Sequence, residues 1–185
     1  MKTGYAKILT ERNFSAFWIA LISFRLATNM FTIGLYWWIY ETTESASILS
    51  MVSTLNFIPI FIFGLFSGVF ADLFNRRKLL IISALARGFL IPIIPLLYYY
   101  QILEIWHIYL IAFLQGTAST FFSTATSAIV PQLVAKDDLM AANSLVDISS
   151  WAANFAGFLA GGINRYIEGR AGWMIRKQIS GGGPM

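Results

Sequence analysis

The sequence predicts an all-α integral membrane protein with about five transmembrane helices. The chain is 57% hydrophobic and only 12% charged, with a mean hydropathy of +0.67, whereas a soluble domain is about 25% charged. Residues 48–71 carry no charged side chain, and residues 79–100 carry one. A hydrocarbon core about 30 Å thick needs roughly 20 apolar residues per helix, so both runs are long enough to cross it.

The apolar runs predict five spans, which follow an amino terminus at residues 1–13. The spans are placed at 14–40, 48–71, 79–100, 106–130 and 139–163. The first run is too long for a signal-peptide core, so it is expected to be a retained helix. The connections are short, which favours antiparallel neighbours in a bundle.

Charge in the connections predicts how the chain is oriented. The loop cations before the fifth span all fall on one side of the membrane: Lys2, Lys7, Arg12, Arg76, Arg77, Lys78 and Lys136. Cytoplasmic loops are enriched in Lys and Arg, so the amino terminus is expected to be cytoplasmic in a multi-pass protein of the cell membrane. The net charge of +4 is therefore read as a topology signal, and nucleic acid is not expected as a partner.

The chain after the fifth span departs from this pattern. Residues 164–185 are expected to be an atypical tail that does not cross the bilayer, and their four cations would lie on the outer side, against the charge bias. A truncation or a frameshift would explain such a tail, and the truncated product would then be inactive. The alternative is a genuine short protein with an amphipathic surface tail, a small membrane-embedded regulator that binds another membrane polypeptide.

A short charged segment between the second and third spans holds the most specific motif. It runs from Gly68 to Lys78 and reads Gly-Val-Phe-Ala-Asp-Leu-Phe-Asn-Arg-Arg-Lys. Gly64 and Gly68 would allow a neighbouring helix to approach closely. Asn75 is expected to tolerate left-handed backbone geometry. The alternative is that Arg76, Arg77 and Lys78 only set the topology and Asp72 caps the loop.

Together with its flanking spans, this segment resembles the loop between the second and third helices of major facilitator transporters. The end of the first span, Tyr36-Trp37-Trp38-Ile39-Tyr40-Glu41-Thr42-Thr43, is similar to macrolide-efflux and enterobactin-exporter relatives. The resemblance implies an incomplete amino-terminal six-helix half of a twelve-helix fold. It also implies export of a small amphipathic compound driven by protons, with the carboxy-terminal half missing. Carried over by position, Asp72, Arg76, Arg77 and Lys78 would form a cytoplasmic gate with Gly68 as a packing residue.

Charged groups within the spans are the other candidates for function. Arg25, Arg87 and Asp147 lie inside the first, third and fifth spans, where ionisable groups are costly and usually face a bundle interior or a water-filled path. Asp147 is expected to pair with Arg87 or Arg25, and competition between desolvation and a nearby cation would suit it to proton coupling. Asn29 on the first span and Gln115 on the fourth are further cavity candidates. The alternative for the uncharged residues is interhelical hydrogen bonding.

The remaining features exclude several function classes. The chain has no cysteine and a single histidine, His107, so neither a metal site nor a cofactor is expected, and no nucleotide-binding loop or nucleophile elbow is present. An enzyme is therefore not expected. Gly157 and Gly161 on the fifth span are expected to form a packing face.

Overall fold

The computed structural model describes residues 8–73 and 75–180, with side chains described for residues 8–68 and 75–160. The helices are α2 (Arg12–Thr43), α3 (Ala46–Leu73), α4 (Arg76–Tyr99), α5 (Ile105–Leu133) and α6 (Leu139–Ser180), with a short 3₁₀ turn at Lys136–Asp138. No strand occurs in these ranges, so the predicted all-α fold is confirmed.

Four helices in the described part of the chain are long and apolar enough to cross a membrane. They are α2, residues 46–68 of α3, α4 and α5. The fifth predicted span does not meet this criterion within the described residues. It carries Asn143, Asp147 and Asn154 among its apolar residues, which lowers its hydropathy.

The fifth span is predicted to end at Ile163, whereas the helix that contains it, α6, continues to Ser180. The chain passes through Gly161 and Gly162 without a break. A glycine in a helix interior costs only about 1 kcal/mol relative to alanine, and no proline occurs between Pro131 and Pro184 to stop the helix. The predicted atypical tail is therefore helical over most of its length, while residues 181–185 lie outside the described residues.

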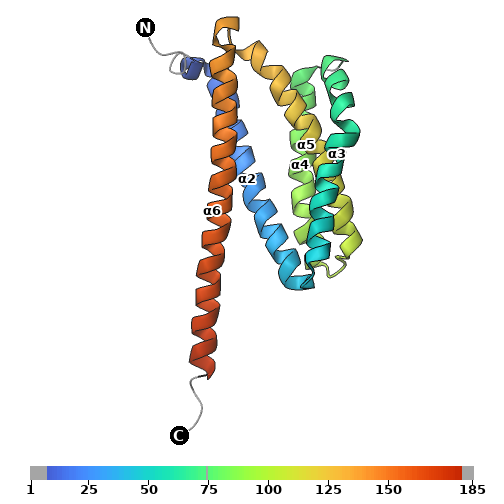
Figure 1. The fold of residues 1–185 in the computed structure, drawn as a ribbon, viewed down its shortest axis with the longest axis vertical. Coiled ribbons are helices and arrows are strands. Elements are labelled where there is room, and N and C mark those ends of the chain that lie inside the picture. The colour runs from blue at the N-terminus through green and yellow to red at the C-terminus, as the bar shows by residue number, and fades with distance from the viewer. Residues whose placement is uncertain (1–7, 74, 181–185) are drawn as a thin grey trace.

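The helices pack as a pair and a group of three (Figure 1). α5 packs against both α3 and α4, and α2 packs along α6. α2 leans across from the pair to the group, so it contacts α6 near its start and α3 near its end. The space between the pair and the group is where the candidate site lies.

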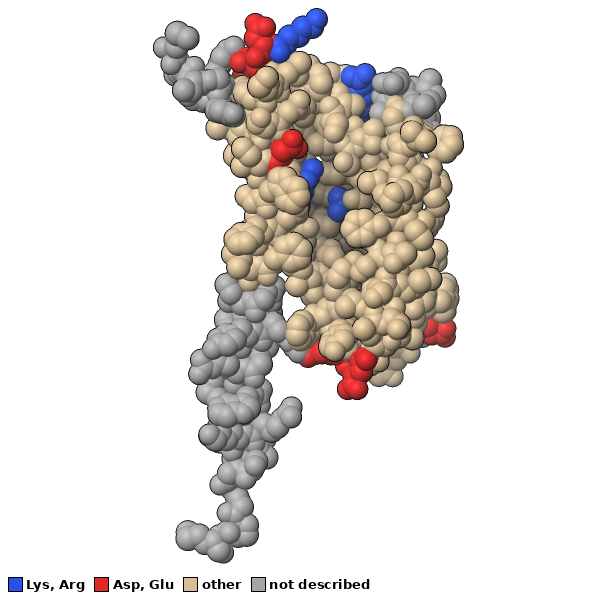
Figure 2. All heavy atoms as spheres, viewed as in Figure 1, with Lys and Arg blue, Asp and Glu red and all other residues tan. Residues whose placement is uncertain are grey.

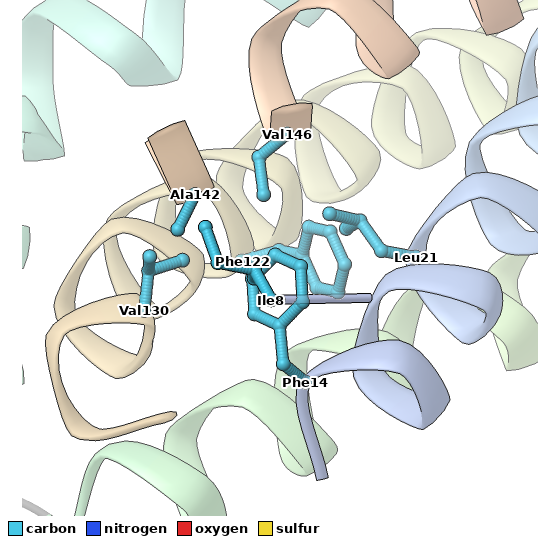
Figure 3. Close-up of a cluster of buried hydrophobic side chains, with 7 residues drawn as sticks. All are labelled: Ile8, Phe14, Leu21, Phe122, Val130, Ala142 and Val146. Atoms are coloured by element: carbon cyan, nitrogen blue, oxygen red, sulfur yellow. The ribbon is translucent and has the colours of Figure 1, made fainter. Parts of the chain in front are cut away.

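Two hydrophobic clusters join the pair to the group. The first lies where α2, α5 and α6 meet (Figure 3), and its buried members are Ile8, Phe14, Leu21, Phe122, Val130, Ala142 and Val146. The second lies near the opposite end, where α2 and α3 meet the start of α5, and it comprises Ile39, Val52, Ile108 and Ala112. Between helices that are surrounded by apolar lipid, such clusters stabilise the fold through close van der Waals packing. The clusters hold the two ends together and leave the middle free for polar residues.

Among the described residues outside the middle of the helices, the cations gather at one end of the molecule. The end that carries the starts of α2, α4 and α6 has Arg12, Arg76, Arg77, Lys78 and Lys136. The described connections at the opposite end, 44–45 and 100–104, contain only acidic charges, and Figure 2 shows red without blue there. This is the asymmetry that a positive-inside topology requires.

The sequence suggested that the basic triplet, Arg76, Arg77 and Lys78, lies in a loop. The structure instead places it in the first turn of α4. Asn75 precedes it with φ −61° and ψ 113°, which is extended and not left-handed, so the expected role of Asn75 was wrong. Its side chain instead caps α4, because its Oδ1 accepts hydrogen bonds from the backbone N–H groups of Arg77 at 3.1 Å and Lys78 at 3.3 Å. Three cations in the first turn oppose the helix dipole, so the cap offsets an unfavourable arrangement.

We expect Asn75→Ala to lower the free energy of unfolding by about 1 kcal/mol, because both capped N–H groups lose their acceptor. Unfolding of the detergent-solubilised protein by SDS, followed by circular dichroism, measures this loss. Asn75→Ser is the matched control, since its hydroxyl can still accept from the first turn. Equal losses for the serine and alanine variants would contradict a capping role.

One of the expected glycines makes a close helix contact, and so does Gly116, which was not expected. A Cβ on Gly157 would lie 2.7 Å from Asn29 Cβ, so this predicted packing glycine does pack, against α2. A Cβ on Gly64 or Gly68 would meet nothing within 4 Å, so the packing expected there does not occur within the described part of the chain. Gly161 lies outside the described side chains. The tightest contact is at Gly116 on α5, where a Cβ would collide with the backbone carbonyl of Asn56 on α3.

Candidate substrate cavity between α2 and the α3–α5 group

A polar cavity of about 70 Å³ lies between α2 and the group formed by α3, α4 and α5. Its polar lining residues come from all four helices: Thr28, Thr32, Tyr36, Asn56, Arg87, Gln115 and Ser119. A site of this size and polarity holds a few water molecules but not a whole drug-sized ligand. Such a concentration of polar groups in the middle of apolar helices marks the candidate site.

Arg87 supplies the cavity's positive charge from the middle of α4. Its guanidinium carbon lies 5.1 Å from the ring centroid of Phe24 and 5.4 Å from that of Phe122. The two rings contact each other, with centroids 5.1 Å apart. Cation–π contacts stabilise a desolvated cation by about 2 kcal/mol or more, which offsets much of an insertion cost of at least about 2.5–3.5 kcal/mol.

The hydrogen bonding of Arg87 is nevertheless incomplete. Its Nε is buried and has no hydrogen-bond partner. The charged group with the strongest influence on it is another cation, Arg25. The site therefore holds a guanidinium against two aromatic faces, with no carboxylate within ion-pair distance among the described side chains.

Two amide side chains fix the helices around Arg87. Gln115, a predicted cavity residue, lines the cavity and donates from Nε2 to the backbone carbonyl of Arg87 at 3.2 Å. Asn56 donates from Nδ2 to the carbonyl of Ala112 at 3.3 Å, and it also lines the cavity. Sequence reasoning missed Asn56. Its signal was that it is the one amide in an uncharged second span whose other polar side chains are hydroxyls of Ser and Thr.

Arg25 and Asp147 lie beside the cavity on the paired helices α2 and α6. Arg25 is half-buried, and its Nε has no hydrogen-bond partner. Asp147 is exposed and is the carboxylate whose field acts on Arg25. The expected partner of Asp147 is thus Arg25 and not Arg87, although no ion pair within 4.0 Å joins these described side chains. Figure 2 shows blue and red side chains close together on a hollowed part of this face, between the two ends of the molecule.

Asn29 does not line the cavity, contrary to expectation. It lies on the seam between α2 and α6, where its Nδ2 donates to Oδ1 of Asn154 at 2.5 Å. Trp18 forms a second bond across the same seam, from Nε1 to Ser149 Oγ at 2.9 Å. These bonds favour the alternative interpretation for Asn29, which is interhelical hydrogen bonding.

An apolar crevice of about 340 Å³ adjoins the polar cavity between α2 and α4. The two share the lining residues Phe31, Leu35 and Ile94, so they are neighbours along these helices. Trp38 and Tyr98 close the far end of the crevice, with ring centroids 5.3 Å apart in an edge-to-face contact. A polar pocket next to an apolar crevice of this size is suited to a ligand with one polar and one apolar end.

The predicted gate residues lie at the basic end, apart from the cavity. Arg76 donates from Nη1 to the carbonyl of Ala128 on α5 at 3.2 Å, which ties the start of α4 to α5. Arg77 and Lys78 are exposed. The side chain of Asp72 lies outside the described residues, so the gate arrangement stays a prediction.

No group of three or more His, Asp or Glu side chains that could hold a metal ion occurs in the described residues. His107 has a structural role at the start of α5. Its Nδ1 accepts from the backbone N–H of Glu104 at 3.1 Å, and its ring stacks on Trp106 at 3.8 Å between centroids. Its Nδ1 therefore acts as part of the cap at the start of α5.

Comparison with protein families places these features in context. Residues 3–169 match the family model described as transmembrane secretion effector, a family of the major facilitator superfamily. The chain belongs to this family. The resemblance to major facilitator transporters is thereby confirmed, and the chain is a transporter-family membrane protein whose apolar helices contact lipid.

Two macrolide efflux proteins are similar to this chain. Macrolide efflux protein A of Streptococcus pyogenes is 26% identical over 126 residues, which is 68% of this chain and 31% of that protein. Macrolide efflux protein A of Enterococcus faecalis is 30% identical over 95 residues, which is 51% of this chain and 29% of that protein. The chain spans about a third of the length of these curated relatives. No solved structure matches it.

Proposed function

We propose that this chain forms the amino-terminal part of a secondary efflux transporter, and that the cavity around Arg87 is part of its path for a small amphipathic compound. The observation that carries the proposal is a charged, polar cavity among membrane-spanning helices, in a chain similar to macrolide efflux proteins. In secondary transporters the substrate site lies near the bilayer midplane between two structural repeats. Arg87 is near the middle of α4, in keeping with that depth.

The proposal includes a cell-membrane location with a cytoplasmic amino terminus. The segregation of cations to the end that carries the starts of α2 and α4 supports it. With that orientation Asp72, Arg76, Arg77 and Lys78 would lie at the cytoplasmic face. There they would act as a gate against a carboxy-terminal half or another membrane polypeptide.

The function is tested with two proteins in a strain that lacks its own efflux pumps. One is the 185-residue chain, and the other is the chain extended by any sequence that the source genome encodes beyond codon 185. We expect the extended protein to lower cellular accumulation of amphipathic drugs, and the chain alone to leave it unchanged. Unaltered accumulation with both proteins, each verified in the membrane, would remove efflux as the function.

Asp147 is the proposed proton-coupling residue, because it is the exposed carboxylate whose field acts on Arg25. Alternating exposure of a carboxylate near a cation allows it to take up and release protons. We expect Asp147→Asn in the active extended protein to abolish drug export that is driven by a pH gradient in everted vesicles. Asp137→Asn, an exposed carboxylate in the 3₁₀ turn, is the matched control. Export unchanged by Asp147→Asn would exclude Asp147 from coupling.

A further inference from the structure

We propose that the cavity around Arg87 selects a monoanionic amphipathic ligand, such as an aromatic or aliphatic carboxylate, with its apolar part in the crevice between α2 and α4. This inference rests on the proposed function and names its substrate class. The names of the relatives point to macrolides. The charged side chain on the cavity wall of this chain, Arg87, favours a negatively charged ligand.

The first step is the charge count around the cavity. Arg25, Arg87 and Asp147 are the charged side chains described between the two ends of the helices, so this region carries one more cation than anion. Asp147 acts on Arg25. The main charged neighbour of Arg87 is Arg25, which is itself a cation. The guanidinium of Arg87 thus lacks a counter-ion of its own.

The second step is the hydrogen bonding of the two guanidiniums. Both Arg25 and Arg87 have a buried Nε without a hydrogen-bond partner, and buried polar groups in proteins are rarely left in this condition. Phe24 and Phe122 contact Arg87 through their ring faces, which stabilise the charge but accept no strong hydrogen bond. A carboxylate supplies both of the missing elements, a negative charge and acceptors in a geometry that matches guanidinium.

The third step is the shape of the adjoining space. The polar cavity of about 70 Å³ is large enough for a carboxylate group, and the neighbouring crevice of about 340 Å³ is almost wholly apolar. Phe31, Leu35 and Ile94 line both. A ligand with its head at Arg87 would pass these side chains to place its body against Trp38 and Tyr98. The pair of volumes therefore selects an amphipathic anion over a small inorganic one.

The test measures binding of 1-naphthaleneacetate and of its uncharged amide to the purified 185-residue chain, in nanodiscs of phosphatidylcholine. The two probes share the naphthyl ring and differ in the head group, which is an anionic carboxylate in one and an uncharged amide in the other. We expect the carboxylate to bind about tenfold or more tightly than the amide, as a charge-assisted hydrogen bond would give. Arg87→Gln should reduce the two affinities to the same value. Arg87→Lys should retain part of the preference, which separates loss of charge from loss of folding.

Arg12→Gln is the matched control, because Arg12 is exposed at the start of α2, away from the cavity. Equal affinity of the wild-type chain for the two probes, or a preference that survives Arg87→Gln, would overturn the anion assignment and leave the efflux proposal standing. Absence of binding by both probes would overturn the anion assignment, whereas the efflux proposal stands or falls with the accumulation measurement. Loss of carboxylate binding when phosphatidylglycerol is added would assign the anion site to a lipid head group and overturn its assignment to substrate.

Discussion

Gly116→Ala is expected to destabilise the chain by about 3 kcal/mol, at the upper end of the usual cost of overpacking. A Cβ at this position would lie 2.8 Å from the carbonyl carbon of Asn56 and 3.1 Å from its Cα. The obstacle is backbone and not the end of a flexible side chain, so α3 and α5 would have to move apart. That movement would also displace Asn56 and Gln115 from the cavity wall.

The measurement is SDS unfolding of the detergent-solubilised variants, followed by tryptophan fluorescence. Gly64→Ala on α3 is the matched control, because a Cβ there meets nothing within 4 Å. Alanine is also the better helix former by about 1 kcal/mol. Gly64→Ala should therefore be neutral or stabilising. Similar stability of the two alanine variants would show that α3 and α5 do not approach closely at Gly116.

Arg87→Met is expected to change stability in the opposite direction, raising it by on the order of 1 kcal/mol while ligand binding is lost. Replacement of a buried charge by an apolar side chain of similar volume is often neutral or stabilising. The new thioether would keep a favourable contact with the rings of Phe24 and Phe122. A residue that lowers stability is retained where function needs it. A variant that gains stability and loses ligand binding would therefore identify Arg87 as a functional residue.

Arg25→Met provides the comparison in the same unfolding experiment. Arg25 has Asp147 as a counter-charge, so its removal leaves a carboxylate without a cation. We expect this variant to gain no stability. A loss of several kcal/mol with Arg87→Met would instead mean that Arg87 is mainly a structural residue held by its aromatic neighbours.

The sequence predicted the class of fold and most charged positions because long apolar runs and isolated charges are local signals. Gln115 and Arg87 were expected near a cavity, and both line it. Whether Arg25 or Arg87 is the neighbour of Asp147 depends on which helices pack together. The packing of α2 along α6 could not be predicted from the sequence. Periodicity alone could not distinguish Asn29, on the α2–α6 seam, from a cavity residue, since seam and cavity lie on adjacent strips of one helix.

Glycines were predicted less well, for a related reason. The spacing of Gly64 and Gly68 indicates only that a helix can approach there, whereas Gly116 stands alone and gives no motif. Which glycine is used depends on the position of the neighbouring backbone. The end of α6 was missed because Gly161-Gly162 and the charges that follow are typical of a membrane exit, although they do not prevent a helix from continuing.

The claim that the cavity around Arg87 is a positively charged ligand site is tested most directly by thiol labelling. The chain has no cysteine of its own, so Ser119→Cys introduces a single thiol into the cavity wall. Asp137→Cys, exposed in the 3₁₀ turn, and Leu85→Cys, on an exposed apolar face of α4, provide the reactive and unreactive controls.

We expect the thiol of the Ser119→Cys variant to react faster with an anionic methanethiosulfonate than with a cationic one, because the neighbouring guanidinium attracts the anion. We also expect 1-naphthaleneacetate to slow this reaction by occupying the cavity. A cavity thiol that reacts equally with both reagents, or that naphthaleneacetate does not protect, would contradict the account.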